Sequence, residues 1–306
     1  MTSATERRVS TGRTRRTWLA EAYHYVLPAV AILLVVSLYP FIRAISISMH
    51  DFNLLRPNSI PFIGLTNFKE VLAAEETRNA FKVTVCFTFG SVTLELILGL
   101  LLAIFFNREF PGKGLARSLV LVPMILSPVV VGLVWRIFYD ADAGMVNYFL
   151  SFLGFSPRSW LSEPSTALPA LIFTDVWQWT PFCFVVSLAG LESLPREPFE
   201  AARIDGASAL ATFRYMTIPL MKPLLALAFI IRLIDSVKVF DLVFIMTNGG
   251  PGRLTETMNF LIYQTGFRFF HMGVAASQAL LLTIVVTIFC SLFVRSLVKA
   301  IGGEDS

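Results

Sequence analysis

Glu200-Ala201-Ala202-Arg203-Ile204-Asp205-Gly206-Ala207 is a polar stretch between two long apolar segments of the chain. Pro195 and Pro198 precede its centre and fit the first turn of a short helix, where a missing N–H does no harm. Gly206 can adopt the left-handed conformation that ends a helix. A second short helix is predicted from about Ser208 to Thr217. The stretch therefore predicts helix, glycine turn and helix, a shape suited to docking into a partner's groove.

The composition indicates a membrane protein. Of the 306 residues, 55% are hydrophobic and only 15% are charged, and the mean hydropathy is +0.69. Soluble domains carry about 25% charged residues. The apolar residues come in blocks, which favours several membrane crossings over one large core.

Six apolar blocks predict an all-α integral membrane fold with six transmembrane helices. The predicted spans are about Tyr25 to Ser48, Val83 to Phe106, Ser118 to Phe138, Leu168 to Leu191, Leu220 to Met246 and Val274 to Leu297. Each holds roughly 20 residues or more, which fits a bilayer core of about 30 Å. Pro123 and Pro128 interrupt the third span and predict a kink in it. The expected domains are a basic tail over 1–24, a six-helix transmembrane domain over 25–297 and a short tail over 298–306.

The distribution of basic residues predicts the orientation. With the N-terminus inside, the inside segments hold 14 Lys and Arg residues and the outside loops hold 7. This bias favours an N-in, C-in topology, with both termini and the polar stretch in the cytoplasm. The first apolar block is too long for a signal peptide. The arginines before it are better explained by orientation than by nucleic-acid binding.

No pattern in the chain predicts an enzyme. No segment matches the phosphate-binding pattern G-x-x-x-x-G-K-[ST], and no Ser/His/Asp or Cys/His arrangement suggests hydrolysis. Catalytic residues, metal ligands and cofactors are therefore not expected. If ATP drives transport, another polypeptide must hydrolyse it.

The polar stretch resembles a known loop. Its pattern Glu200-Ala201-Ala202-x-x-Asp205-Gly206-Ala207, followed by Phe213, Ile218-Pro219 and Pro223, is similar to the EAA loop of binding-protein-dependent ABC importer permeases. Met216 and Ile218 depart from the usual residues but keep their apolar bulk. The resemblance implies a type I ABC importer permease fold. It also implies that the loop over 195–223 couples to an ATPase through Glu200, Ala201, Ala202, Asp205, Gly206 and Ala207.

Two further motifs resemble the carbohydrate-importer branch, the maltose and glycerol-3-phosphate type. They are Thr247-Asn248-Gly249-Gly250-Pro251 and Trp177-x-x-x-Pro181-Phe182. The resemblance implies a multi-pass protein of the bacterial inner membrane that transports a carbohydrate. The implied partners are a second permease in a heterodimer, two ATPase subunits and an extracytoplasmic solute-binding protein, with lipid around them and no nucleic acid.

The resemblance also implies a substrate path. Gln178 and Trp179 match family positions that contact substrate, and so does the region from Asp235 to Asp241, which contains Ser236 and Lys238. A Trp ring suits the apolar face of a sugar and a Gln amide suits its hydroxyls. Packing and interfacial anchoring are the alternative explanation for Trp179. Lys238 raises the possibility of an anionic substrate.

Four charges recur every three residues in the fifth span: Arg232, Asp235, Lys238 and Asp241. Adjacent members can pair at i,i+3 on a helix. They form either a self-neutralised ladder against a protein neighbour or, at Lys238 and Asp241, part of the sugar path. An alternative function is a secondary transporter coupled to ions through Glu95, Asp175 or Asp241.

Overall fold

The computed structural model describes residues 14–302, and this part of the chain folds as helices without a strand. Five long helices within it are long and apolar enough to cross a membrane. They are α1 (Thr14–Ser48), α3 (Glu75–Phe106), α7 (Ala167–Ser193), α10 (Ile218–Val237) and α12 (Met272–Gly302). The prediction of an all-α membrane fold is confirmed. Most of the predicted tail over 1–24 lies outside the described residues, and α1 begins before the predicted Tyr25.

Two further helices are long and apolar enough to cross a membrane only when taken together. They are α4 (Lys113–Ile125) and α5 (Pro128–Phe138), which meet at 98°. The remaining elements are short: α2 (Thr66–Ala73), α6 (Met145–Ser151), α8 (Glu197–Ile204), α9 (Ala209–Thr212), α11 (Met258–Tyr263), and the π-helical turns η1 (Phe213–Thr217), η2 (Val243–Thr247) and η3 (Gln264–Arg268).

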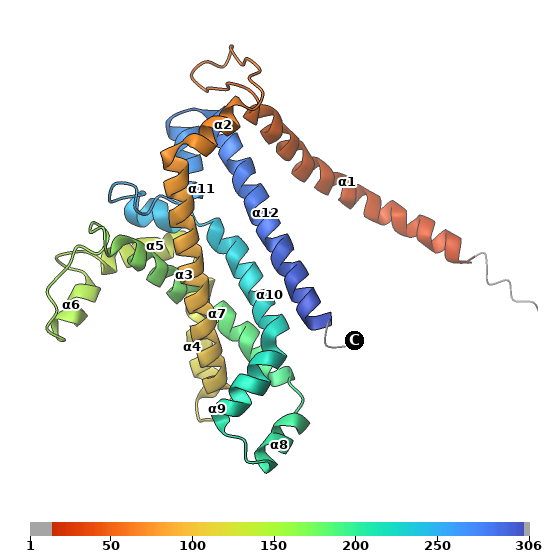
Figure 1. Ribbon diagram of the computed structural model, residues 1–306, viewed down its shortest axis with the longest axis vertical. Coiled ribbons are helices and arrows are strands. Elements are labelled where there is room, and N and C mark those ends of the chain that lie inside the picture. The colour runs from red at the N-terminus through yellow and green to blue at the C-terminus, as the bar shows by residue number, and fades with distance from the viewer. Residues whose placement is uncertain (1–13, 303–306) are drawn as a thin grey trace, which may run out of the picture.

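Helices α3 and α7 form the centre of the bundle, with α10 against both (Figure 1). Gly99 of α3 allows their close approach, because an added Cβ there would lie 2.6 Å from the Cβ of Cys183. That distance is shorter than two carbon atoms tolerate in a packed core. Buried Phe106 and Phe184 pack beside this contact with their ring centroids 5.1 Å apart.

The predicted kink in the third span is a full break. Leu126 and Ser127 are extended, with ψ near 141° and 138°, and α5 starts at Pro128. A residue before proline is pushed out of the helical region, which explains the extended Ser127. The break leaves the Leu126 carbonyl without a helical partner, and Gln178 Nε2 donates to it at 3.0 Å.

The predicted fifth span from Leu220 to Met246 is wrong at its end. Helix α10 ends at Val237, Lys238 is its C-cap, and the helix does not continue through Val239 and Phe240. Distant side chains bind the carbonyls at this break. Asn259 Nδ2 donates to the Lys238 oxygen at 2.8 Å, and Thr257 Oγ1 donates to the Val239 oxygen at 3.3 Å.

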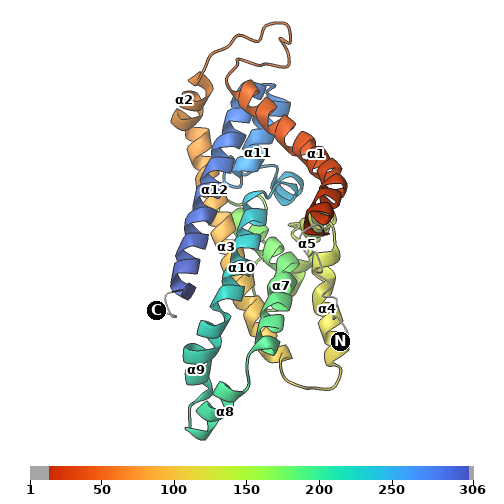
Figure 2. The ribbon, with the colours of Figure 1, turned by 90° about the vertical axis from the view of Figure 1, so that its right-hand side faces the viewer.

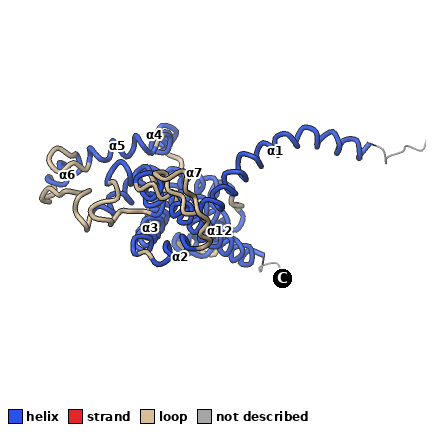
Figure 3. Tube along the Cα trace, turned by 90° about the horizontal axis from the view of Figure 1, so that it is seen from above, coloured by secondary structure: helices blue, strands red, loops and turns tan. Residues whose placement is uncertain are grey.

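The two ends of the bundle differ (Figure 2). The loop with α8 and α9 lies at one end, together with the connection between α3 and α4. Helix α2 and the loop before it lie at the opposite end. Helix α1 leans away from the bundle when seen from above (Figure 3). Every residue over 25–43 of this helix is exposed, and Ser48 at its end is buried.

Candidate functional site

A buried arginine joins the three central helices. Arg232 of α10 donates from Nε to Glu95 Oε2 of α3 at 2.7 Å and from Nη2 to Oε1 at 3.0 Å. The same Nη2 donates to Asp175 Oδ2 of α7 at 3.3 Å. A single charge in the middle of a membrane helix costs about 2.5–3.5 kcal/mol on insertion scales. The bidentate pairing of Arg232 with Glu95 and its contact with Asp175 offset the cost of burying these charges.

One face of α7 carries the next residues of the site. Asp175, Gln178 and Trp179 are spaced i, i+3 and i+4 and therefore share a side of the helix. The Trp179 ring lies 4.6 Å from the Arg232 guanidinium carbon, in cation–π contact. The arginine thus fixes the tryptophan as well as the two acids.

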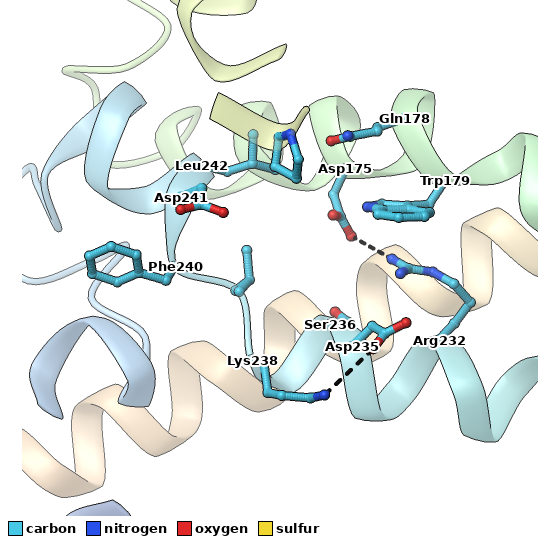
Figure 4. Close-up of a pocket in the computed structure, with 12 residues that line it drawn as sticks. Asp175, Gln178, Trp179, Arg232, Asp235, Ser236, Lys238, Phe240, Asp241 and Leu242 are labelled. Atoms are coloured by element: carbon cyan, nitrogen blue, oxygen red, sulfur yellow. Dashed lines mark hydrogen bonds and ion pairs between the residues drawn. The ribbon is translucent and has the colours of Figure 1, made fainter. Parts of the chain in front are cut away.

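These side chains border a cavity of about 130 Å³. Every residue predicted for the substrate path lines it: Gln178, Trp179, Asp235, Ser236, Lys238 and Asp241. Figure 4 shows them converging from α7, from the end of α10 and from the segment after it. Phe240 falls within the predicted region from Asp235 to Asp241, whereas the sequence did not predict that Pro128, Asp175, Arg232 and Leu242 would also line the cavity.

The prediction that four charges form a ladder along one helix is wrong, because α10 ends before Asp241. Arg232 pairs with Glu95 and Asp175 rather than with Asp235. Asp235 Oδ1 instead lies 3.6 Å from Lys238 Nζ, with both side chains about half exposed. Asp241 follows the break, so it does not share a helix with the other three. The ladder becomes one buried cluster, one exposed pair and a separate carboxylate.

Two buried polar atoms at the cavity have no hydrogen-bond partner among the described residues. They are Gln178 Oε1 and Ser236 Oγ. Both residues are at least nine-tenths buried and line the cavity. Because the Gln178 amide nitrogen donates to Leu126, the oxygen is the atom left over. Buried polar atoms normally have partners, so these two mark a place for a ligand or water.

The loop at the other end has the predicted helix–turn–helix form. Gly206 has φ +75° between α8 and α9, and nothing within 4 Å obstructs a Cβ there. The Ala207 N–H donates to the Ala202 oxygen at 2.9 Å, which closes the end of α8. Ser208 Oγ accepts from the Ala211 N–H at 3.2 Å and caps α9.

Large apolar side chains on this loop and on the turns after it are exposed. Ile204 is 86% exposed, and Leu210 and Tyr215 are each 73% exposed. Glu200, Ala201, Asp205 and Gly206 are exposed as well, while Ala202 is partly covered. Large apolar side chains that are exposed in this way are available for contact with another protein.

A bundle of membrane-crossing helices with a charged cavity among them and an exposed helical loop at one end is the architecture of a membrane permease. Residues 95–302 match the family described as the binding-protein-dependent transport system inner membrane component. The chain belongs to this family of ABC importer permeases, multi-pass membrane proteins that are transport components rather than enzymes.

Named relatives cover most of the chain. A probable ABC transporter permease of Sinorhizobium fredii, y4oQ, is 42% identical over 87% of this chain and 86% of its own length. The trehalose/maltose transport system permease protein MalF of Thermococcus litoralis is 37% identical over 89% of this chain and 92% of its own. Among solved structures, a chain of a bacterial ABC transporter involved in the import of the acidic polysaccharide alginate matches with a TM-score of 0.79 at 23% identity. The match covers 93% of this chain and 96% of that chain, and it shows a similar fold.

Proposed function

We propose that this chain is a permease subunit of an ATP-driven, binding-protein-dependent carbohydrate importer, in which it forms half of the translocation path. The family supplies the transport class. The carbohydrate class is supported by the trehalose/maltose transport system permease protein of Thermococcus litoralis, which is similar to this chain over 89% of its length.

The observation that carries the proposal is the cavity. It combines a half-buried Trp179 ring with buried polar atoms of Gln178 and Ser236 that lack partners among the described residues. A ring face packs against the C–H face of a sugar, while amide and hydroxyl groups bond to its hydroxyls. Packing within the chain gives these two atoms no partner, whereas the hydroxyls of a sugar in the cavity would.

Two neighbouring tryptophans on α7 allow a matched test. Trp179 lines the cavity, whereas Trp177 lies on another side and contacts Trp135. In liposomes that hold the complete complex with its binding protein, uptake of radiolabelled trehalose and maltose should fall at least about tenfold in Trp179→Ala, the equivalent of about 1.4 kcal/mol of lost contact. Trp177→Ala should keep most uptake. Equal uptake by native protein and Trp179→Ala, with assembly verified by size exclusion, would reject the path.

The proposal includes coupling at the other end of α10. We propose that the loop over 195–223 docks into one of two ATPase subunits, with Glu200, Ala201, Ala202, Asp205, Gly206 and Ala207 forming or shaping its contact surface. The exposed Ile204 and Leu210 support this role, because they offer apolar area that this chain does not cover. A second permease and a solute-binding protein complete the proposed assembly.

The orientation is part of the same proposal, with the tails over 1–24 and 298–306 and the loop in the cytoplasm. A periplasm-active reporter fused after Asn248 should give signal, and the same reporter fused after Ala207 should give none. The reverse pattern contradicts the N-in, C-in arrangement of the permease domain over 25–297.

An ion-coupled secondary transporter is not favoured. The family is one of ABC importers. Moreover, Glu95 and Asp175, two of the three acids that could bind a coupling ion, are held by Arg232.

A further inference from the structure

We infer that the cavity selects uncharged, polyhydroxylated saccharides over acidic ones, and that Asp241 is a specificity-determining residue. The inference rests on the proposed function and concerns the charge class of its substrate. It is opposite to the anionic substrate that Lys238 suggests in the sequence.

The strongest cation at the cavity is already neutralised. Arg232 makes three hydrogen bonds to two carboxylates and is covered by the Trp179 ring. Its charge is therefore balanced by Glu95 and Asp175 at distances of 2.7–3.3 Å. An anion entering the cavity would meet the guanidinium only together with these two acids.

The remaining charges leave the cavity acidic. Lys238 is paired with Asp235 at 3.6 Å. Asp241 lines the cavity and has no cationic partner within the part of the chain that the structure describes. Among the residues that line the cavity, Arg232 and Lys238 oppose three carboxylates, those of Asp175, Asp235 and Asp241, so the formal charge of the lining is −1 with these groups ionised.

The hydrogen-bonding groups give an independent argument. The unpartnered Gln178 Oε1 is an acceptor, and so are both oxygens of the Asp241 carboxylate. A sugar hydroxyl can donate to each of these atoms. A carboxylate or sulfonate offers only acceptors, so where such a group replaces a hydroxyl next to these atoms it cannot donate to the Gln178 oxygen and it faces Asp241 with a like charge. Ser236 Oγ can serve either kind of ligand because it both donates and accepts.

Direct binding to the permease separates this selectivity from that of the solute-binding protein. The probes are maltotriose, which is neutral, and trigalacturonate, which carries three carboxylates. The assembled complex of both permeases and both ATPases is placed in nanodiscs without the binding protein. Saturation-transfer-difference NMR at low ionic strength then measures the binding of each sugar.

Native complex should bind maltotriose and bind trigalacturonate at least about tenfold more weakly, as expected for like charges a few ångströms apart in a partly buried site. Asp241→Asn keeps the size of the side chain and should strengthen trigalacturonate binding about fivefold, with maltotriose binding changed less than about twofold. Asp51→Asn removes an exposed charge far along the chain and outside the cavity, and should change neither.

The outcomes are separable. Equal or tighter binding of trigalacturonate by native complex overturns the inference while leaving the carbohydrate function intact. An unchanged preference in Asp241→Asn overturns the role of that residue. Binding of neither sugar by correctly assembled complex contradicts the proposed function, and the inference falls with it.

Discussion

The two ends of helix α10 are built in opposite ways. Near its C-terminal end, Arg232 is bound to residues 137 and 57 positions away in the chain. Beyond its N-terminal end, the loop around Gly206 is closed by hydrogen bonds between residues three to five apart. The first end depends on the assembled bundle, and the second depends on local sequence. Substitutions in the buried cluster of Arg232, Glu95 and Asp175 should therefore disturb folding as well as transport, whereas substitutions in the loop should affect coupling alone.

The largest expected effect is at the buried cluster. Arg232→Met leaves Glu95 and Asp175 buried without their cation, and breaking a buried pair in this way costs about 3–5 kcal/mol. We expect a large loss of folded, assembled complex, measured by fluorescence-detected size exclusion after mild heating. Lys222→Met removes an exposed cation from the same helix and should have little effect.

The cluster also allows a rescue. Adding Glu95→Gln and Asp175→Asn to Arg232→Met removes the uncompensated charges, and the triple variant should recover part of the lost assembly. Failure of this rescue, or a stable Arg232→Met single variant, would contradict the conclusion that the C-terminal end of α10 depends on its long-range ion pairs.

At the loop we expect Gly206→Pro to uncouple ATP hydrolysis from uptake without reducing assembly. Proline fixes φ near −65°, which is incompatible with the +75° of this turn. The measurement is the ratio of labelled sugar taken up to phosphate released, which should fall at least about tenfold. Gly154→Pro alters another exposed left-handed turn, with φ +82°, and should leave the ratio unchanged. A normal ratio in Gly206→Pro would show that the loop does not couple.

Glu200→Lys should have a smaller effect on the same ratio. Glu200 is exposed near the start of α8, where a negative charge favours the helix by about 0.3–1 kcal/mol. The substitution reverses a charge on the proposed docking surface while leaving the backbone turn intact. We expect a several-fold loss of coupling that grows at low salt, because exposed charges are screened at high salt. A loss that is independent of salt would exclude an electrostatic role.

The smallest effect should come from the loop after η2. There Arg253 only partly offsets the unfavourable burial of the Glu256 carboxylate. Burial raises the pKa of Glu256 above its ordinary value of 4.5, against the opposing effect of Arg253 at 3.7 Å. The folded state therefore holds this proton more tightly than the unfolded state. The contribution of Glu256 to the free energy of unfolding is therefore fully present below pH 4.5 and is lost as the pH rises through the raised pKa.

Glu256→Gln should remove this contribution. We expect its melting temperature to exceed that of the native protein by a small margin at neutral pH, with the difference shrinking as the solution is acidified towards the ordinary pKa of a Glu. Differential scanning fluorimetry across this pH range provides the measurement. A variant that melts lower at neutral pH would mean that the ion pair with Arg253 outweighs the burial.

The sequence predicted those features that depend on local pattern. Apolar blocks gave the number of crossings, and the position of Gly206 gave the turn between α8 and α9. The residues of the cavity came from a family resemblance. What the sequence could not give was long-range geometry. Helix α10 ends at Val237 because Asn259 and Thr257 bind the carbonyls beyond it, and no periodicity within the span reveals such partners.

The buried ion pairs illustrate the same limit. Glu95 and Asp175 were conspicuous as acids within apolar blocks, but spacing along the chain suggested Asp235 as the partner of Arg232. The correct partners lie on other helices and meet Arg232 only when α3, α7 and α10 pack together. Likewise, Pro123 and Pro128 predicted a kink, but the angle of 98° depends on contacts such as that of Gln178 with Leu126.

The unbroken run from Ala209 through the π-helical turn η1 to Val237 has a mechanical consequence. Its 29 residues form a rod about 44 Å long at a rise of about 1.5 Å per residue. A tilt of about 5° around the middle of such a rod moves each tip by roughly 2 Å in opposite directions. Arg232 lies nine residues from the middle of the run, so the same tilt shifts it by about 1 Å, which is enough to lengthen ion pairs of 2.7–3.3 Å. A small rotation imposed at the far tip would thereby strain the buried cluster.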